Sequence, residues 1–167
     1  DDEMAETLRS LAFHGKGETQ YDNVRVGVNS RLDTIQAAIL IEKLAILEDE
    51  MEKRQAVARR YNEGLRGVVK VPEISSGSRS AWAQYAIETP RRDELKAHLA
   101  EAGIPSVIYY VKPLHQQVAY SQYQTAPGGL SLSEELPSRI LCLPMHPYLG
   151  NADQDRIIDT ITGFIGR

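Results

Sequence analysis

The feature that most constrains this chain is a long helical stretch between residues 32 and 65. It contains no proline and a single glycine, Gly64, and is rich in Ala, Leu, Glu, Lys and Arg, which favour helix. As one straight helix, its 34 residues would extend about 51 Å at 1.5 Å per residue. A compact domain of 167 residues is narrower than this. We therefore expect the helix to kink, or to bridge two lobes.

Apolar residues recur along this stretch with a spacing of four and three. The series is Leu40, Leu44, Leu47, Met51, Ala58, Tyr61 and Leu65. Arg54 stands at one expected apolar position and interrupts the repeat. The pattern leaves two interpretations open: a helix that packs within one chain, and a dimeric coiled coil that acts as a non-catalytic dimerisation module.

Short elements typical of an α/β protein follow from residue 67 onwards. Apolar and β-branched runs predict strands, and these cover residues 68–71, 82–88, 106–111 and 140–143. Alternation of such strands with helices favours an α/β fold. The sequence therefore predicts a helical segment over residues 1–66, followed by a small α/β domain over residues 67–167.

Helix boundaries are marked by residues that cap or terminate helices. Asp1 or Asp2 can cap a short first helix, and Thr89–Pro90 can begin another that ends at Gly103. Residues 132–139 predict a further short helix. We expect Asn151, paired with Gln154 in a capping box, to begin the last helix.

Composition argues against several classes of protein. A net charge of −4 without a basic block disfavours nucleic-acid binding, and no apolar run reaches the roughly 18 residues of a membrane span. The four histidines lack ligand spacing, so no metal site is predicted. Glycine-rich nucleotide loops and the serine-hydrolase elbow are absent. The single Cys142 cannot form an internal disulfide, which fits a cytoplasmic protein.

Two polar clusters lie between the predicted elements. The first, Gly27–Asp33, stands at the entrance to the long helix and contains Asn29 and Arg31. An amide and a guanidinium at a helix N-terminus can hold an anion, whereas Asn29 or Ser30 could also simply cap the helix. The second cluster, Tyr109–His115, ends a predicted strand, a favoured place for ligand binding, although its tyrosines could equally pack against a helix.

Four motifs in a fixed order give the chain a resemblance to a known family. They are "HG", "VGVNSRLDTIQAAIL", "IYYVKPLHQQ" and "LPMHPYL", the last followed by an amphipathic helix. The chain resembles the C-terminal half of the DegT/DnrJ/EryC1/StrS aminotransferases, which use pyridoxal 5'-phosphate (PLP) to aminate nucleotide-linked keto-sugars. The "VGVNSRLDTIQAA" variant resembles members that aminate UDP-linked 3-keto uronic acids for bacterial surface polysaccharides such as O-antigen.

This resemblance implies a fold, a reaction and roles for particular residues. The fold would be the small C-terminal domain of a fold-type I PLP-dependent transferase, of the aspartate-aminotransferase type, preceded by a long linking helix. Asn29 would reach the cofactor phosphate across the interface of a homodimer with shared active sites. Arg31, Tyr109, Tyr110 and His115 would line the substrate side, although the family usually has histidine where Tyr109 stands. L-glutamate would supply the amino group.

The resemblance also implies that the Schiff-base lysine lies outside this chain. The chain starts, by resemblance, shortly after that lysine, and its six lysines match none of the family contexts. No residue present here is therefore predicted to be catalytic, and we expect the chain alone to be inactive. A dehydratase of the same superfamily, in which histidine replaces the lysine, remains an alternative for the complete protein.

Overall fold

The structure is a computed structural model that describes residues 1–19 and 21–166. These residues form two compact units, the first comprising Asp1–Leu47 and the second beginning at Glu48. The sequence had placed a boundary after residue 66 instead. The difference arises because the helix before that point buries Val57, Tyr61 and Leu65 in the core of the second unit.

The long helical stretch is divided into two helices, α2 (Thr34–Ala45) and α3 (Leu47–Leu65). They are separated at Ile46, whose φ of −103° and ψ of 0° are not helical. The expectation that the stretch is not one straight helix is therefore confirmed. A coiled-coil seam along its whole length is excluded, because Tyr61 and Leu65 pack inside their own unit.

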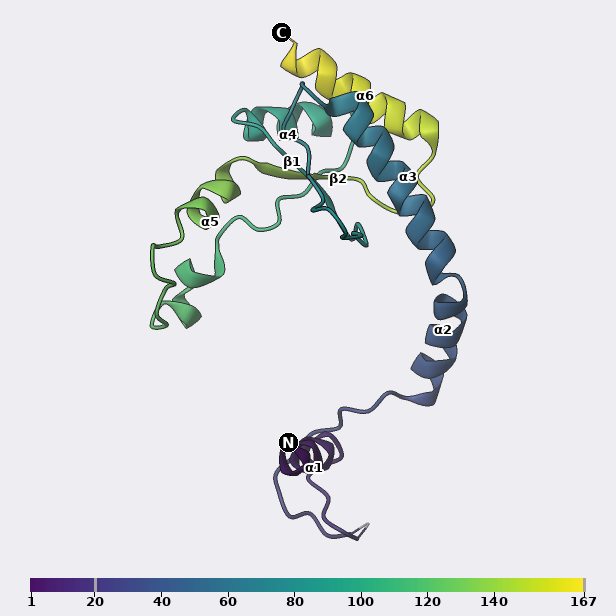
Figure 1. Ribbon diagram of the computed structural model, residues 1–167, viewed down its shortest axis with the longest axis vertical. Helices are drawn as coiled ribbons and strands as arrows, with labels where there is room; N and C mark the ends of the chain where they lie inside the picture. The colour runs from purple at the N-terminus through teal and green to yellow at the C-terminus, as the bar shows by residue number, and fades with distance from the viewer. Residues whose placement is uncertain (20, 167) are drawn as a thin grey trace. The chain divides into compact units, whose positions relative to one another are not determined.

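The second unit is built around two antiparallel strands, β1 (Tyr85–Glu88) and β2 (Ile140–Leu143). Tyr85 pairs with Leu143 and Glu88 with Ile140. Figure 1 shows α3, α4 (Arg92–Glu101) and α6 (Asn151–Ile165) gathered around this strand pair. The fold class, mixed α/β, is as predicted.

The core of the second unit lies between these helices and the strand pair. Its most deeply buried apolar side chains are Tyr61, Leu65, Tyr85, Ile87, Leu95, Leu99, Leu141 and Ile161. The Tyr61 hydroxyl donates to the Pro144 carbonyl at 3.0 Å, and the Tyr85 hydroxyl donates to Asn62 Oδ1 at 2.6 Å. Burial raises the pKa of both phenols well above the ordinary value, so both stay neutral donors.

Trp82 closes one side of this core. Its side chain is 6% exposed, and its ring centroid lies 5.6 Å from that of Tyr85. The indole Nε1 donates to Gln55 Oε1 at 2.8 Å, and Arg54 donates to the Trp82 carbonyl at 3.1 Å. Arg54 therefore interrupts the apolar repeat because it satisfies a backbone carbonyl above the core.

Two of the four predicted strands, 68–71 and 106–111, form only isolated bridges. Lys70 exchanges backbone hydrogen bonds with Glu88, and Val107 exchanges them with Cys142. Pro72 has no N–H to extend the first pairing. After Val107 the chain leaves the strand pair, forms two 3-10 turns (η1, Leu114–Gln116; η2, Val118–Tyr120), and returns through α5 (Ser131–Glu135) and η3 (Leu136–Ser138).

Helix ends follow the predictions only in part. Asp1 caps α1 (Asp2–Ala12) by accepting from the Met4 N–H at 3.3 Å, as expected. However, α4 begins at Arg92 rather than Pro90, and Gly150, not Asn151, is the N-cap of α6. Gln154 does not complete a capping box, because its amide turns inward and donates to the Val57 carbonyl at 3.0 Å.

Candidate functional site

Asn29 and Arg31 lie in the extended segment that joins α1 to α2. Both side chains are exposed. The segment leads directly into α2, as the sequence predicts, but the helix begins only at Thr34, so Asn29 and Arg31 lie before its first turn. Asp33 is the N-cap, and its N–H donates to Gln36 Oε1 at 3.3 Å. Neither Asn29 nor Ser30 caps the helix, so the capping interpretation of these residues is wrong.

The backbone around Asn29 is fixed to the end of α1. The N–H of Val28 donates to the Leu11 carbonyl at 2.8 Å, and the N–H of Ser30 donates to the Ala12 carbonyl at 2.9 Å. In return, the His14 N–H donates to the Val28 carbonyl at 3.0 Å. These bonds satisfy carbonyls that a helix C-terminus leaves without partners, and they fix residues 28–30 in place.

Two glycines make this arrangement possible. A Cβ at Gly15 would lie 1.8 Å from the Arg25 carbonyl oxygen, and one at Gly27 would lie 2.2 Å from the Gly15 nitrogen. Gly15 also has a φ of +75°, which side chains disfavour. The close approach of the two backbones therefore requires glycine at both positions.

Asn29 and Arg31 form a directly bonded pair. Arg31 Nε donates to Asn29 Oδ1 at 2.8 Å. The arginine carries only donors, so this bond occupies the amide oxygen and leaves the amide N–H groups available. The remaining groups of the pair, Asn29 Nδ2 and the two Arg31 Nη atoms, are all donors. Such a pair is suited to an anion, and in particular to a phosphate or a carboxylate.

Tyr109 and Tyr110 lie in the second unit, beside the bridge between Val107 and Cys142. Their ring centroids are 5.5 Å apart, and a cis peptide bond joins them. Tyr109 lines a pocket of about 210 Å³ beside Cys142 and Met145, whereas Tyr110 does not. Burial raises the pKa of the Cys142 thiol, which disfavours the reactive thiolate.

His115 lies on the first 3-10 turn of the same unit. Its Nε2 is 3.0 Å from Glu134 Oε1, a partner that the sequence analysis missed because 19 residues separate the two. His115 lines a different pocket from Tyr109, of about 500 Å³, with Tyr120 and Tyr123. The structure therefore brings Asn29 to Arg31 and Tyr109 to Tyr110, and pairs His115 with Glu134.

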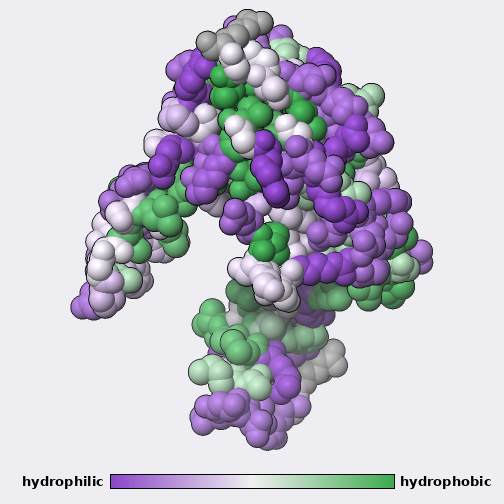
Figure 2. Space-filling view, turned by 45° about the horizontal axis from the view of Figure 1, so that its top comes forward, coloured by the Kyte–Doolittle hydropathy of each residue, from purple (hydrophilic) through white to green (hydrophobic). Residues whose placement is uncertain are grey.

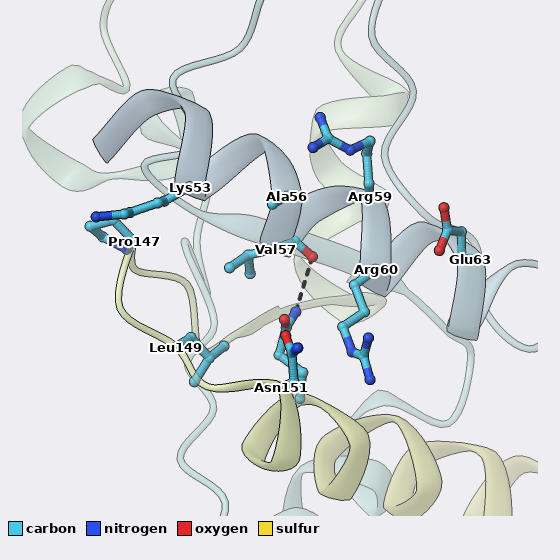
Figure 3. Close-up of a pocket in the computed structure, with 10 residues that line it drawn as sticks. Lys53, Ala56, Val57, Arg59, Arg60, Glu63, Pro147, Leu149 and Asn151 are labelled. Carbon is cyan, nitrogen blue, oxygen red and sulfur yellow. Dashed lines mark hydrogen bonds between the residues drawn. The ribbon is translucent and has the colours of Figure 1, made fainter. Parts of the chain in front are cut away.

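A further pocket, of about 390 Å³, lies between α3 and the start of α6 (Figure 3). Lys53, Arg59 and Arg60 line it together with Asn151. Two of these cations have partners, since Lys53 lies 2.6 Å from Asp49 and Arg60 lies 2.5 Å from Asp155. None of the residues predicted from the sequence to bind a ligand lines this pocket.

Within residues 1–19 and 21–166, no group of three or more His, Cys, Asp or Glu side chains is arranged to hold a metal ion. Over the same residues, every helix is too short or too polar to cross a membrane.

Comparison with known proteins identifies the family. Residues 1–162 match the DegT/DnrJ/EryC1/StrS aminotransferase family. A UDP-2-acetamido-2-deoxy-3-oxo-D-glucuronate aminotransferase from Pseudomonas aeruginosa is 39% identical over 97% of this chain, which covers 44% of that protein. The chain thus spans less than half the length of this relative.

Solved structures agree with this relationship. A DegT DnrJ EryC1 StrS aminotransferase from Brucella abortus is 72% identical and superposes with a TM-score of 0.92, covering all of this chain and 45% of that one. NtdA from Bacillus subtilis, which holds the cofactor PMP, is 27% identical with a TM-score of 0.85, covering all of this chain and 40% of that one. These matches agree with the predicted family, fold class and pyridoxal-phosphate cofactor. The chain belongs to the DegT/DnrJ/EryC1/StrS aminotransferase family.

Proposed function

We propose that this chain is the C-terminal part of a PLP-dependent aminotransferase that moves an amino group from L-glutamate to a UDP-linked 3-keto sugar, a uronic acid. The observation that carries the proposal is the bonded pair of Asn29 and Arg31. The side-chain nitrogens that this bond leaves available, Asn29 Nδ2 and the Arg31 Nη atoms, are all hydrogen-bond donors, and an anionic ligand needs donors. The relative from Pseudomonas aeruginosa, named for a 3-oxo-glucuronate substrate, supports the choice of sugar.

Asn29 would hold the phosphate of the cofactor through its amide N–H groups. The structure fits this role, because Arg31 occupies the amide oxygen, which would otherwise repel a phosphate. PLP, when bound, supplies the electron sink for amino-group transfer. The task of this part of the chain is to hold the phosphate and orient the substrate.

Arg31 would bind the carboxylate of the uronic acid. A carboxylate entering a partly desolvated site needs a cation, and the planar guanidinium can bind both of its oxygens. The Nη atoms of Arg31 are available for this, since only Nε donates to Asn29. Tyr109, Tyr110 and His115 would line the remainder of the substrate site, with Glu134 orienting the His115 ring.

The complete protein would act as a cytoplasmic homodimer in the synthesis of a surface polysaccharide. Helix α2 supports the dimer, because its isoleucines and leucines are exposed on all sides in this chain. A helix that is apolar all round is normally buried in the functional assembly. Apolar side chains are also exposed elsewhere on both units (Figure 2).

The Schiff-base lysine would come from outside this chain. All six lysines are partly or fully exposed, and hydrogen bonding to Asp49 raises the pKa of Lys53, the opposite of what an imine-forming amine needs. We expect this chain, mixed with PLP and borohydride, to give no stable adduct at one lysine. Peptide mapping distinguishes such an adduct from random surface labelling, and a single labelled site would contradict the proposal.

The role of Arg31 is tested on the complete gene product by measuring the two half-reactions separately. Arg31→Ala should slow amination of the UDP-linked 3-keto uronic acid far more than it slows conversion of the cofactor by glutamate. A UDP-linked 3-keto sugar without the carboxylate is the matched substrate. With PLP supplied at a saturating concentration, so that weaker phosphate binding through Asn29 is compensated, its rate should change little. If the glutamate half-reaction suffers equally, Arg31 serves the amino donor and the uronic-acid assignment is wrong.

A further inference from the structure

We propose that Phe13 is a positioning residue for the cofactor phosphate, because its ring holds the Arg31 guanidinium that in turn orients the Asn29 amide. This inference rests on the proposed function of Asn29. It adds a residue that the sequence motifs do not contain, since Phe13 precedes the "HG" motif and lies 16 residues before Asn29.

The contact between Phe13 and Arg31 has the geometry of a cation–π interaction. The Cζ atom of Arg31 lies 4.6 Å from the centroid of the Phe13 ring, within the distance at which the ring quadrupole attracts a cation. The backbones are coupled as well, because Phe13 and Asn29 form an antiparallel bridge. Phe13 thus contacts one member of the pair through its ring and the other through its backbone.

The Phe13 ring restrains the orientation of the Asn29 side-chain amide through Arg31. With its guanidinium held against Phe13, Arg31 keeps Nε at 2.8 Å from Asn29 Oδ1. An exposed amide without this partner can turn over and present its oxygen, which a phosphate would repel. Phe13 therefore acts through Arg31 to keep the N–H groups of Asn29 available.

A second cation uses the same ring. Lys16 Nζ lies 4.1 Å from the Phe13 centroid. The ring therefore contacts two positive groups, those of Lys16 and Arg31. Their combined field attracts an anion more strongly than either cation alone. The two cations thus add to the attraction for a phosphate, against the carboxylates of Glu6, Glu18 and Asp22, which line the same cleft as Lys16.

The test compares the affinity of the apoenzyme of the complete gene product for PLP with its affinity for pyridoxal, which lacks the phosphate. The dissociation constant of pyridoxal divided by that of PLP isolates the contribution of the phosphate, and this ratio falls when the phosphate is held less tightly. Phe13→Leu keeps an apolar side chain but removes the ring, and Phe13→Tyr keeps the ring. Phe13→Met is a second non-aromatic variant, in case the leucine variant does not fold.

The chain offers a matched control in its other unit. Arg91 lies over the Phe164 ring with its Cζ 4.1 Å from the centroid. Phe164→Leu therefore removes a cation–π contact that has no part in the proposal, together with the stacking of His98 on the same ring. Thermal melting and circular dichroism of every variant report whether the fold is retained.

We expect the non-aromatic variants at Phe13 to lower the ratio about two- to fivefold, the range of an exposed cation–π contact. Asn29→Ala should lower it about tenfold or more. Phe13→Tyr and Phe164→Leu should match the parent. A parental ratio in Phe13→Leu, or an equal loss in Phe13→Tyr, would overturn the role of the ring. If Asn29→Ala also keeps the parental ratio, the proposed phosphate role of Asn29 fails with it.

Discussion

Helices α2 and α3 share one apolar repeat, interrupted at Arg54, but have opposite environments. Leu44, on α2, is 69% exposed, whereas Leu65, on α3, is fully buried. The second unit thus provides its own core, with α3 as one wall. The helices of the first unit, α1 and α2, contain no buried side chain, although α2 is more apolar than α3. An apolar repeat thus specifies a helix face that needs a partner, and tertiary structure decides whether the same chain supplies that partner.

Truncation of one leucine in each helix should show the largest difference between α2 and α3. In this chain, Leu65→Ala should cost about 2–5 kcal/mol of unfolding free energy, because it leaves a cavity in the core. Leu44→Ala should change it by no more than about 0.5 kcal/mol, as for an exposed position. Urea unfolding of both variants measures the difference, and equal losses would contradict the distinction between the helices.

The same two variants, made in the complete gene product, test whether α2 is covered there. If α2 is covered there, as we propose, the cost of Leu44→Ala should rise above about 1 kcal/mol while that of Leu65→Ala stays the same. Sedimentation of the leucine variants shows whether the added cost accompanies a change in the dimer.

A variant in each unit should distinguish cofactor binding by the first unit from the stability of the second. In the complete protein, Asn29→Ala should weaken PLP binding by about 1.5–3 kcal/mol, the value of a hydrogen bond to a charged group, with little change in Tm. Tyr85→Phe should lower the Tm and leave PLP binding unchanged, because it removes the hydrogen bond from the Tyr85 hydroxyl to Asn62. Equilibrium dialysis and thermal melting distinguish the two. If the Asn29→Ala protein binds PLP as tightly as the parent, Asn29 does not bind the cofactor phosphate.

The smallest expected effect contrasts two glycines. Gly27→Ala should destabilise the chain by about 1–3 kcal/mol, because its Cβ would collide with the backbone of Gly15. Gly163→Ala, on α6 with open space around it, should stabilise by about 0.5–1 kcal/mol, because alanine favours helix. Denaturant unfolding of both reports the sign of each change, and a neutral Gly27→Ala would show that the first unit tolerates movement of the Asn29 segment.

Features specified by neighbouring residues could be predicted from the sequence. Asp1 caps α1, Gly103 follows α4 with a φ of +68°, and Ile140–Leu143 forms a strand, all from local signals. The break at Ile46 has no such signal, since neither glycine nor proline stands there. It falls where the first unit ends, and that boundary is set by tertiary packing.

Sequence motifs predict which residues belong to the candidate site, but not the contacts between them. Asn29 and Arg31 were identified through resemblance, but their direct bond and the contact with Phe13 depend on how residues 28–30 lie against α1. The predicted strand over residues 106–111 failed for a related reason. Pairing needs a partner strand, and beyond Val107 the chain leaves β2.

The fluorescence of Trp82 distinguishes unfolding of the second unit from unfolding of the first. It is the only tryptophan in the sequence, and it lies in the core of the second unit, shielded from water and within 5.6 Å of Tyr85. Indole emission should therefore be blue-shifted in the folded chain and sensitised by energy transfer from tyrosine. Its shift to longer wavelength during denaturation reports unfolding of the second unit alone. Any transition seen by circular dichroism but silent in this emission belongs to the helices of the first unit.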